Sequence, residues 1–128
     1  MSTEHRTVMI VEDEPDTAEM FAEMMHLSGY EVIKTYSGRP AIALIAQTRP
    51  SAIVLDLMMP DISGLEVMGF MRRDPRLAKI PVIVVSAKSL PSDIKNGLDA
   101  GASIYLTKPV AFMDLKEAIE NAIQSSES

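Results

Sequence analysis

The sequence contains no cysteine, which excludes a disulfide framework and any thiolate that would bind a metal or do redox chemistry. It also has no hydrophobic run near the roughly 20 residues that cross a bilayer. The strongly apolar run Ile80–Val85 is far shorter than that and is interrupted by Pro81. The first residues, Met1–Arg6, lack the apolar centre of a signal peptide. We therefore expect a cytoplasmic protein that does not enter a membrane.

An excess of basic residues is also missing. The chain has 12 lysines and arginines against 18 aspartates and glutamates, which gives a formal net charge of −6. Nucleic-acid backbones select basic surfaces, so we expect no direct binding to DNA or RNA.

Hydrophobic residues, in contrast, are plentiful and make up 47% of the 128 residues. This is enough for the core of one compact domain and leaves little room for a second. We therefore expect a single domain over residues 1–128, with its core within about 7–123 and short polar tails at both ends.

Short apolar runs alternate with amphipathic segments along the chain. The runs favour strands near residues 7–11, 31–35, 53–55, 81–85 and 104–107. Helical patterns follow each of them, and the last has the clearest apolar face, made by Leu115, Ala118, Ile119, Ala122 and Ile123. Alternation at these lengths favours an α/β fold with a parallel sheet covered on both faces. The run 31–35 is the less apolar one and is expected at an edge.

Several helix boundaries can be predicted from local pairs of residues. Asp16 with Glu19, and Ser63 with Glu66, have the spacing of a capping box at a helix start. The helix expected from about Pro91 to Gly101 has a thin apolar face, Ile94 and Leu98, and should be the least firmly anchored. The polar residues 125–128 are expected to fray.

Polar residues follow four of the five predicted strands. Glu12 and Asp13 end the first, Asp56 the third, Ser86 the fourth and Lys108 the fifth. Each alone is ordinary turn or surface chemistry. In a parallel sheet, however, the carboxyl ends of the strands share one edge, where ligands bind. We therefore expect these side chains to meet in one site.

This set of groups suits a metal ion and a phosphoryl group. Three carboxylates at close range raise at least one pKa unless a cation lies among them. Oxygen ligands without histidine or cysteine favour Mg²⁺, with Mn²⁺ as an alternative. Asp56 beside the metal can act as a nucleophile toward phosphorus, while Lys108 pairs with Asp56 or with a phosphoryl oxygen.

From about Thr7 to Ile123, the sequence resembles the receiver domain of two-component response regulators, which has a chemotaxis-regulator-like fold. The matching segments are Ile10–Glu14, Asp56–Pro60 with Gly64, Val84–Ala87, Gly101–Ala102 and Tyr105–Pro109. The resemblance implies a doubly wound (βα)5 fold. Its five-stranded parallel sheet would have the order 2-1-3-4-5, in a flavodoxin-like three-layer sandwich.

The resemblance also implies a role for each site residue. Asp56 would accept a phosphoryl group, and Mg²⁺ would be held by Asp13, Asp56 and the backbone carbonyl of Met58, with Glu12 acting directly or through water. Lys108 would contact the phosphoryl group, next to a cis bond to Pro109.

Ser86 would move toward the phosphoryl oxygen, and Tyr105 would follow it inward. That movement would change the surface made by the fourth helix, fifth strand and fifth helix, where an unknown downstream protein would bind. The phosphoryl donor would be a sensor histidine kinase or a histidine phosphotransfer protein. The protein would be a monomer or a phosphorylation-dependent dimer, and would catalyse only its own phosphorylation and dephosphorylation.

Three positions depart from the common pattern of this family. Glu12 stands where many relatives have Asp, Ser86 where Thr is commoner, and Val110 where an aromatic residue is frequent. The first two keep the carboxylate and the hydroxyl that the chemistry uses.

The sequence allows three alternatives to a stand-alone receiver domain. An aspartyl-phosphate phosphohydrolase needs a second Asp two residues after the nucleophile, and that position is Met58. A phosphate-free look-alike is disfavoured by the intact site residues, and a piece of a larger regulator remains open. His5 and His26 are expected at the surface, since neither has a set of partner ligands.

Overall fold

The computed structural model describes residues 6–127 and shows five parallel strands alternating with five helices. The strands are β1 (Thr7–Val11), β2 (Glu31–Thr35), β3 (Ala52–Leu55), β4 (Val82–Ser86) and β5 (Ile104–Thr107). The helices are α1 (Pro15–Leu27), α2 (Gly38–Thr48), α3 (Gly64–Arg73), α4 (Pro91–Asp99) and α5 (Phe112–Glu127). The expected alternation is therefore confirmed.

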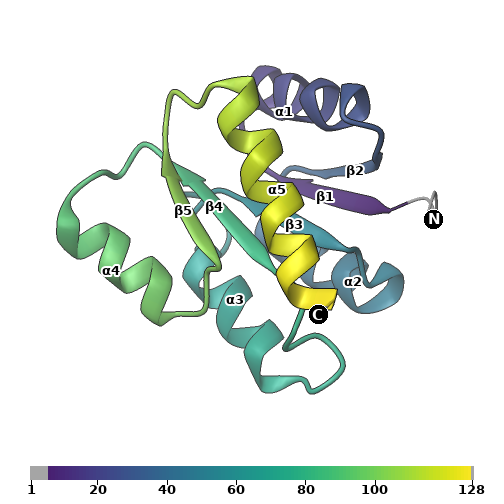
Figure 1. The fold of residues 1–128 in the computed structure, drawn as a ribbon. Coiled ribbons are helices and arrows are strands. Elements are labelled where there is room, and N and C mark those ends of the chain that lie inside the picture. The colour runs from purple at the N-terminus through teal and green to yellow at the C-terminus, as the bar shows by residue number, and fades with distance from the viewer. Residues whose placement is uncertain (1–5, 128) are drawn as a thin grey trace.

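The sheet has the order β2-β1-β3-β4-β5, so the chain winds in both directions from β1 (Figure 1). All four pairings are parallel, and β2 lies at an edge as its composition predicts. The three central strands, β1, β3 and β4, are buried along almost their whole length, as strands covered on both faces must be.

Helices cover both faces of the sheet, which makes three layers (Figure 1). One hydrophobic cluster joins α1 and α5 to one face, and a second joins α2 and α3 to the other. Successive residues of a strand point to opposite faces of the sheet and so belong to different clusters. In β1, Ile10 faces α1 and α5, and Val11 faces α2 and α3. The core thus fixes the register of each strand, and with it the position of every strand end.

Of the two predicted capping boxes, one is wrong and one is confirmed. At the start of α1 the cap is Glu14, whose side chain accepts from the backbone N–H of Thr17 at 2.9 Å, so the predicted box of Asp16 and Glu19 is wrong. Pro15 occupies the first helical position, so the helix starts earlier in the chain than predicted. The box of Ser63 and Glu66 at the start of α3 is confirmed.

The predicted frayed end is also wrong over the described residues, because α5 continues to Glu127. An ion pair between Glu127 and Arg6 connects this last turn to the start of β1. Local sequence cannot reveal such a contact, since the two residues lie at opposite ends of the chain.

Helix α4 is held by a different face from the one expected. Its buried residue is Gly97, whereas Leu98 is 44% exposed and Ile94 is only half-buried. Gly97 lies so close to the Tyr105 ring that an added methyl group would come within 2.7 Å of it. A glycine allows this close approach, and hydropathy patterns give glycine little weight. The expectation that α4 has few buried side chains is confirmed.

Candidate functional site

The site lies at the carboxyl edge of the sheet, and the ends of the strands place its side chains. The backbone N–H of Glu12 donates to Thr35 O at 3.1 Å, which continues the β1–β2 pairing by one residue. The N–H of Asp56 donates to Val11 O at 3.0 Å, and that of Lys108 to Ser86 O at 2.9 Å. Ladder hydrogen bonds thus position the residues that carry the chemistry.

Three carboxylates converge there as predicted. One oxygen atom from each of Glu12, Asp13 and Asp56 lies within 4.8 Å of the others. Glu12 is 2% exposed and Asp56 is 7% exposed, whereas Asp13 faces solvent. Two of the three negative charges are therefore buried, which requires compensation.

Lys108 supplies part of that compensation. Its Nζ donates to Glu12 Oε1 at 2.8 Å and to Asp56 Oδ2 at 3.1 Å. The remaining oxygens of the two buried carboxylates accept from backbone N–H groups, Glu14 at 3.2 Å for Glu12 and Met58 at 3.1 Å for Asp56. The contact of Lys108 with Glu12 was not predicted.

The charges of this cluster do not cancel. Burial raises the pKa of Glu12 above its usual value, and the charge of Asp56 adds to the rise, while hydrogen bonds from Lys108 and Glu14 oppose it. Burial acts to lower the pKa of Lys108, but its bonds to the two carboxylates prevail and the pKa is raised. One ammonium faces three carboxylates, so the donor set fits a divalent cation with a preference for oxygen ligands.

Ser86 ends β4, the strand next to β3, and Tyr105 lies on β5, the following strand of the sheet. The buried Ser86 Oγ accepts from the N–H of Lys88 at 3.2 Å, and the Tyr105 hydroxyl donates to Lys88 O at 2.8 Å. Lys88 therefore joins the two residues through its backbone. Met58 is 53% exposed beside Asp56, while Met59 packs against the core, so the two methionines of the loop play different parts.

Two residues that the sequence did not single out fix the surroundings of the site. Asp61, in the loop between β3 and α3, accepts hydrogen bonds from the start of α2. Arg72, on α3, donates to the carbonyls of Ala78, Ile80 and Gly101. Each partner lies at least six residues away, and no local pattern marks such pairs.

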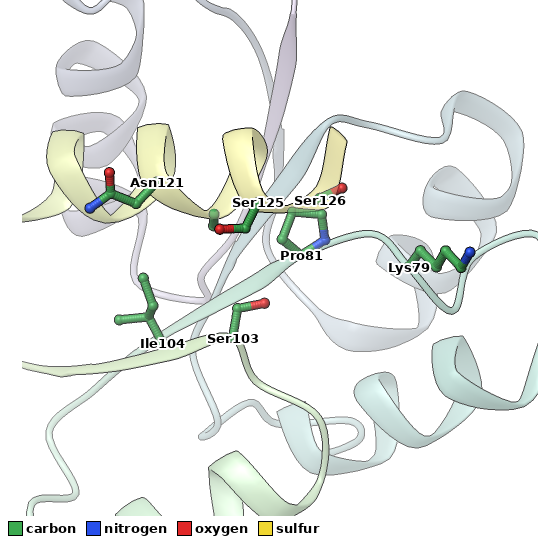
Figure 2. A pocket seen from close by; sticks show the side chains of 8 residues that line it. Lys79, Pro81, Ser103, Ile104, Asn121, Ser125 and Ser126 are labelled. Atoms are coloured by element: carbon green, nitrogen blue, oxygen red, sulfur yellow. The ribbon is translucent and has the colours of Figure 1, made fainter. Parts of the chain in front are cut away.

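A separate groove of about 360 Å³ lies at the opposite edge of the sheet. Figure 2 shows its lining residues at the starts of β4 and β5 and at the end of α5, Pro81, Ser103 and Ser125 among them. Since the carboxylates follow the other ends of the strands, this groove has no part in their chemistry. His26 is exposed as expected, and His5 lies outside the described residues. None of the helices within 6–127 has the length and apolarity to cross a membrane.

Comparisons with known proteins agree with this geometry. Residues 8–120 match the response regulator receiver domain family. The polar-differentiation response regulator DivK of Brucella anthropi is 35% identical over 116 residues, which cover 91% of this chain and 94% of that protein. A putative response regulator from Chloroflexus aurantiacus superposes with a TM-score of 0.91 at 30% identity, over 94% of this chain and 99% of the other.

A third relative bears on the metal. The receiver domain of a sensor histidine kinase from Pseudomonas aeruginosa, solved with a magnesium ion coordinated in its active-site cleft, has a TM-score of 0.88 and 26% identity. The match covers 94% of this chain and 99% of that one. The present chain belongs to the response regulator receiver domain family, and its acidic pocket fits the phosphoacceptor site of such a domain.

Proposed function

We propose that this receiver domain is a phosphorylation-controlled switch and that Asp56 is its phosphoacceptor. The supporting observation is the position of Asp56, nearly buried and yet within 4.8 Å of two further carboxylates. Its two oxygens accept hydrogen bonds from Lys108 and from the N–H of Met58, which fix the orientation of the carboxylate. A carboxylate held in one orientation at a ligand-binding edge is suited to nucleophilic attack.

The reaction transfers a phosphoryl group to a carboxylate oxygen. An Asp56 oxygen attacks phosphorus as the bond from phosphorus to the donor nitrogen breaks, and the electron pair of that bond stays on the nitrogen of the phosphohistidine. The product is an aspartyl-phosphate, and attack by water on its phosphorus later returns the free carboxylate and inorganic phosphate. The chain itself promotes only these two steps, chiefly by positioning and by charge neutralisation.

A divalent cation completes the site. Asp13, Asp56 and the Met58 carbonyl would hold Mg²⁺ or Mn²⁺, and Glu12 would act directly or through water. The bound cation supplies positive charge that offsets the phosphoryl oxygens. The donors fit it because they are all oxygen atoms and carry more negative charge than Lys108 balances.

Lys108 serves as the second positive charge. Its two present partners are the Glu12 and Asp56 carboxylates, and phosphorylation adds oxygens that compete for the same ammonium. Lys108 would then contact the phosphoryl group. Because Lys108 follows β5 directly, its movement is passed to that strand.

The route from the site to the surface uses Ser86, Lys88 and Tyr105. If the Ser86 side chain turns toward a phosphoryl oxygen to donate its hydroxyl proton, its oxygen moves away from the N–H of Lys88, and the loop that holds the Tyr105 hydroxyl is released. The Tyr105 ring packs against Gly97 of α4, so its inward movement frees space beside that helix. The surface of α4, β5 and α5 would change in consequence.

The partners follow from this scheme. The donor would be a sensor histidine kinase or a histidine phosphotransfer protein, and an unknown downstream protein would read the surface of α4, β5 and α5. Residues 1–128 would form one receiver domain in the cytoplasm, as a monomer or a phosphorylation-dependent dimer. A net charge of −6 disfavours direct contact with nucleic acid.

The decisive experiment is intact mass measurement with Mg²⁺ and acetyl phosphate. The wild-type mass should rise by one phosphoryl group, and Asp56→Asn should abolish the rise. The matched control is Asp74→Asn, which changes a half-buried aspartate at the far end of α3 and should be labelled like the wild type. An unmodified wild-type mass would overturn the proposed switch.

A second variant tests the role of Lys108. Lys108→Ala should still bind Mg²⁺ but should lose the difference in partner affinity between the free and phosphorylated forms. The partners can be captured from cells with and without beryllofluoride, a phosphoryl mimic. Unchanged coupling in the variant would show that Lys108 has another role.

A further inference from the structure

The start of helix α2 does not rely on its own sequence for capping. Ser37 has the extended backbone of an N-cap, yet within residues 6–127 its side chain makes no capping hydrogen bond. The first turn, Gly38-Arg39-Pro40, also contains no acidic residue. The free N–H groups at this helix end therefore need a partner from elsewhere.

Asp61 provides that partner from the loop between β3 and α3. Its Oδ1 accepts from the N–H of Gly38 at 2.9 Å, and its Oδ2 accepts from the N–H of Arg39 at 2.8 Å. Both oxygens are used, and the negative charge lies at the positive end of the helix dipole. These backbone bonds lower the pKa of Asp61 from 3.8 to about 2, so the carboxylate is ionised at neutral pH.

Packing reinforces the same contact. Ile62 lies over Gly38 so closely that a methyl group added there would come within 2.5 Å of the Ile62 side chain. Position 38 therefore favours glycine for its lack of a side chain. The contact joins the middle of the loop to α2 through two neighbouring residues, Asp61 by hydrogen bonds and Ile62 by packing.

The loop that Asp61 holds also carries the proposed metal ligands. It leaves β3 at Asp56, passes Met58, and closes at Gly64, whose N–H donates to Leu57 O at 3.0 Å. The Met58 N–H donates to Asp56 Oδ1 at 3.1 Å within it. Between these bonded ends, the segment 59–62 is held by the packing of Met59 on the core and by the contact of Asp61 and Ile62 with α2.

We propose that Asp61 is a positioning residue, which holds the loop against α2 so that Asp56 and the Met58 carbonyl keep the geometry that Mg²⁺ requires. The inference rests on the proposed function for the identity of the ligands. Mg²⁺ demands near-ideal octahedral geometry, so a loosened loop weakens binding even when every ligand is present. Asp61 itself touches neither the metal nor the phosphoryl group.

Removal of the contact gives the first test. Asp61→Ala should weaken Mg²⁺ binding by about tenfold, the lower end of the range for residues that orient metal ligands. Isothermal titration with MgCl₂ measures this directly. The phosphorylation rate with acetyl phosphate should fall at low Mg²⁺ and recover at saturating Mg²⁺, because the nucleophile and Lys108 are unchanged.

Asp74 again offers the matched control. It too accepts with both oxygens, from Arg76 N at 2.9 Å and from Arg76 Nη2 at 2.9 Å, but it lies at the opposite end of α3. Asp74→Ala should leave Mg²⁺ affinity unchanged. Asp61→Asn keeps one acceptor oxygen and should give an intermediate affinity, and it replaces Asp61→Ala if that variant fails to fold.

Thermodynamic linkage gives a second test that needs no variant. If the contact strengthens Mg²⁺ binding, Mg²⁺ must strengthen the contact by the same factor. Amide exchange at Gly38 and Arg39 in the wild type should therefore slow when Mg²⁺ is added, although neither residue is a ligand. Unchanged exchange at both amides would contradict the inference.

The two proposals fail in different ways. A wild-type chain that binds Mg²⁺ without being phosphorylated would contradict the proposed function alone. An Asp61→Ala chain with wild-type Mg²⁺ affinity would contradict the positioning role alone. A wild-type chain that does not bind Mg²⁺ would overturn the positioning role, since no metal geometry would then need support.

Discussion

Helices α3 and α4 occupy corresponding places in the fold, yet they are held very differently. Each follows an inner strand whose end carries a polar site residue, with Asp56 directly after β3 and Ser86 as the last residue of β4. Helix α3 buries Gly64, Val67, Met68 and Met71, and it begins with a complete capping box. In the described chain, α4 buries Gly97 alone.

Arg72 connects the two helices, because it belongs to α3 and binds the backbone just after α4. Its guanidinium donates to Gly101 O, just after α4, and to two carbonyls of the α3–β4 loop. The carboxyl end of α4 is thus fixed to α3, while Leu90 and Leu98 remain exposed along it. The segment from Asp56 through α3 is therefore more extensively buried than the segment from Ser86 through α4.

The largest difference should appear when one side chain is removed from each helix. Met71→Ala, at a fully buried position of α3, should lower the free energy of unfolding by about 2–5 kcal/mol. Leu98→Ala on α4 should change it by about 0.5 kcal/mol or less. Urea unfolding of the two variants measures both, and equal losses would show that α4 is as firmly anchored as α3.

Alanine at one glycine of each helix should change the free energy of unfolding in opposite directions, by less than the loss expected for Met71→Ala. Gly97→Ala would bring a methyl group within 2.7 Å of the Tyr105 ring and should cost about 1–3 kcal/mol. Gly69→Ala on α3 has space, with the flexible end of Arg73 as its nearest neighbour at 3.4 Å, and should stabilise by about 0.5–1 kcal/mol. Thermal unfolding decides the sign. A stabilised Gly97→Ala would mean that Tyr105 does not support α4.

Helix caps should show an effect of about 1 kcal/mol. Ser63→Ala removes the side-chain oxygen that accepts from the N–H of Glu66 at 3.2 Å, and it should cost about that amount. Ser37→Ala, at the start of α2, should cost less than 0.5 kcal/mol, because Asp61 does the capping there. Denaturant unfolding compares the pair, and a larger loss for Ser37→Ala would contradict the role of Asp61 at this helix end.

The smallest expected effect concerns acid. Asp61 has a pKa of about 2 in the folded chain against an ordinary 3.8. A depressed pKa means that the contact stabilises the fold fully above the ordinary value and is lost as pH falls through about 2. An NMR titration of the Asp61 carboxyl carbon should therefore show it still ionised at pH 3. A midpoint near 3.8 would show that the two backbone bonds are weak in solution.

Much of the site could be predicted because its residues follow strands directly. The end of each short apolar run predicts where a strand ends. Parallel pairing then brings all those ends to one edge of the sheet. Glu12, Asp13, Asp56 and Lys108 are brought together in this way, and the resemblance to receiver domains gave them roles. The second contact of Lys108, with Glu12, could not be predicted, because only the tertiary structure brings both carboxylates within reach of one ammonium.

The predictions for the start of α1 and for the buried face of α4 were wrong, because contacts between residues decide these features and the local pattern does not. Asp16 and Glu19 had the spacing of a cap, but Pro15 starts the helix earlier and Glu14 takes the role. Ile94 and Leu98 formed an apolar stripe, but a glycine faces the sheet in α4 because the Tyr105 ring occupies the space there.

The sequence by itself determined the alternation of strands and helices, the buried faces of α1 and α5, and the order of polar residues at the strand ends. These features depend on hydrophobic period and on turn residues, which act over a few positions. Only the tertiary structure decided that Asp61 caps α2, that Arg72 holds Gly101, and that Gly97 meets Tyr105. Those contacts join residues 8 to 29 positions apart along the chain, and the packing of the two layers on the sheet sets their distances.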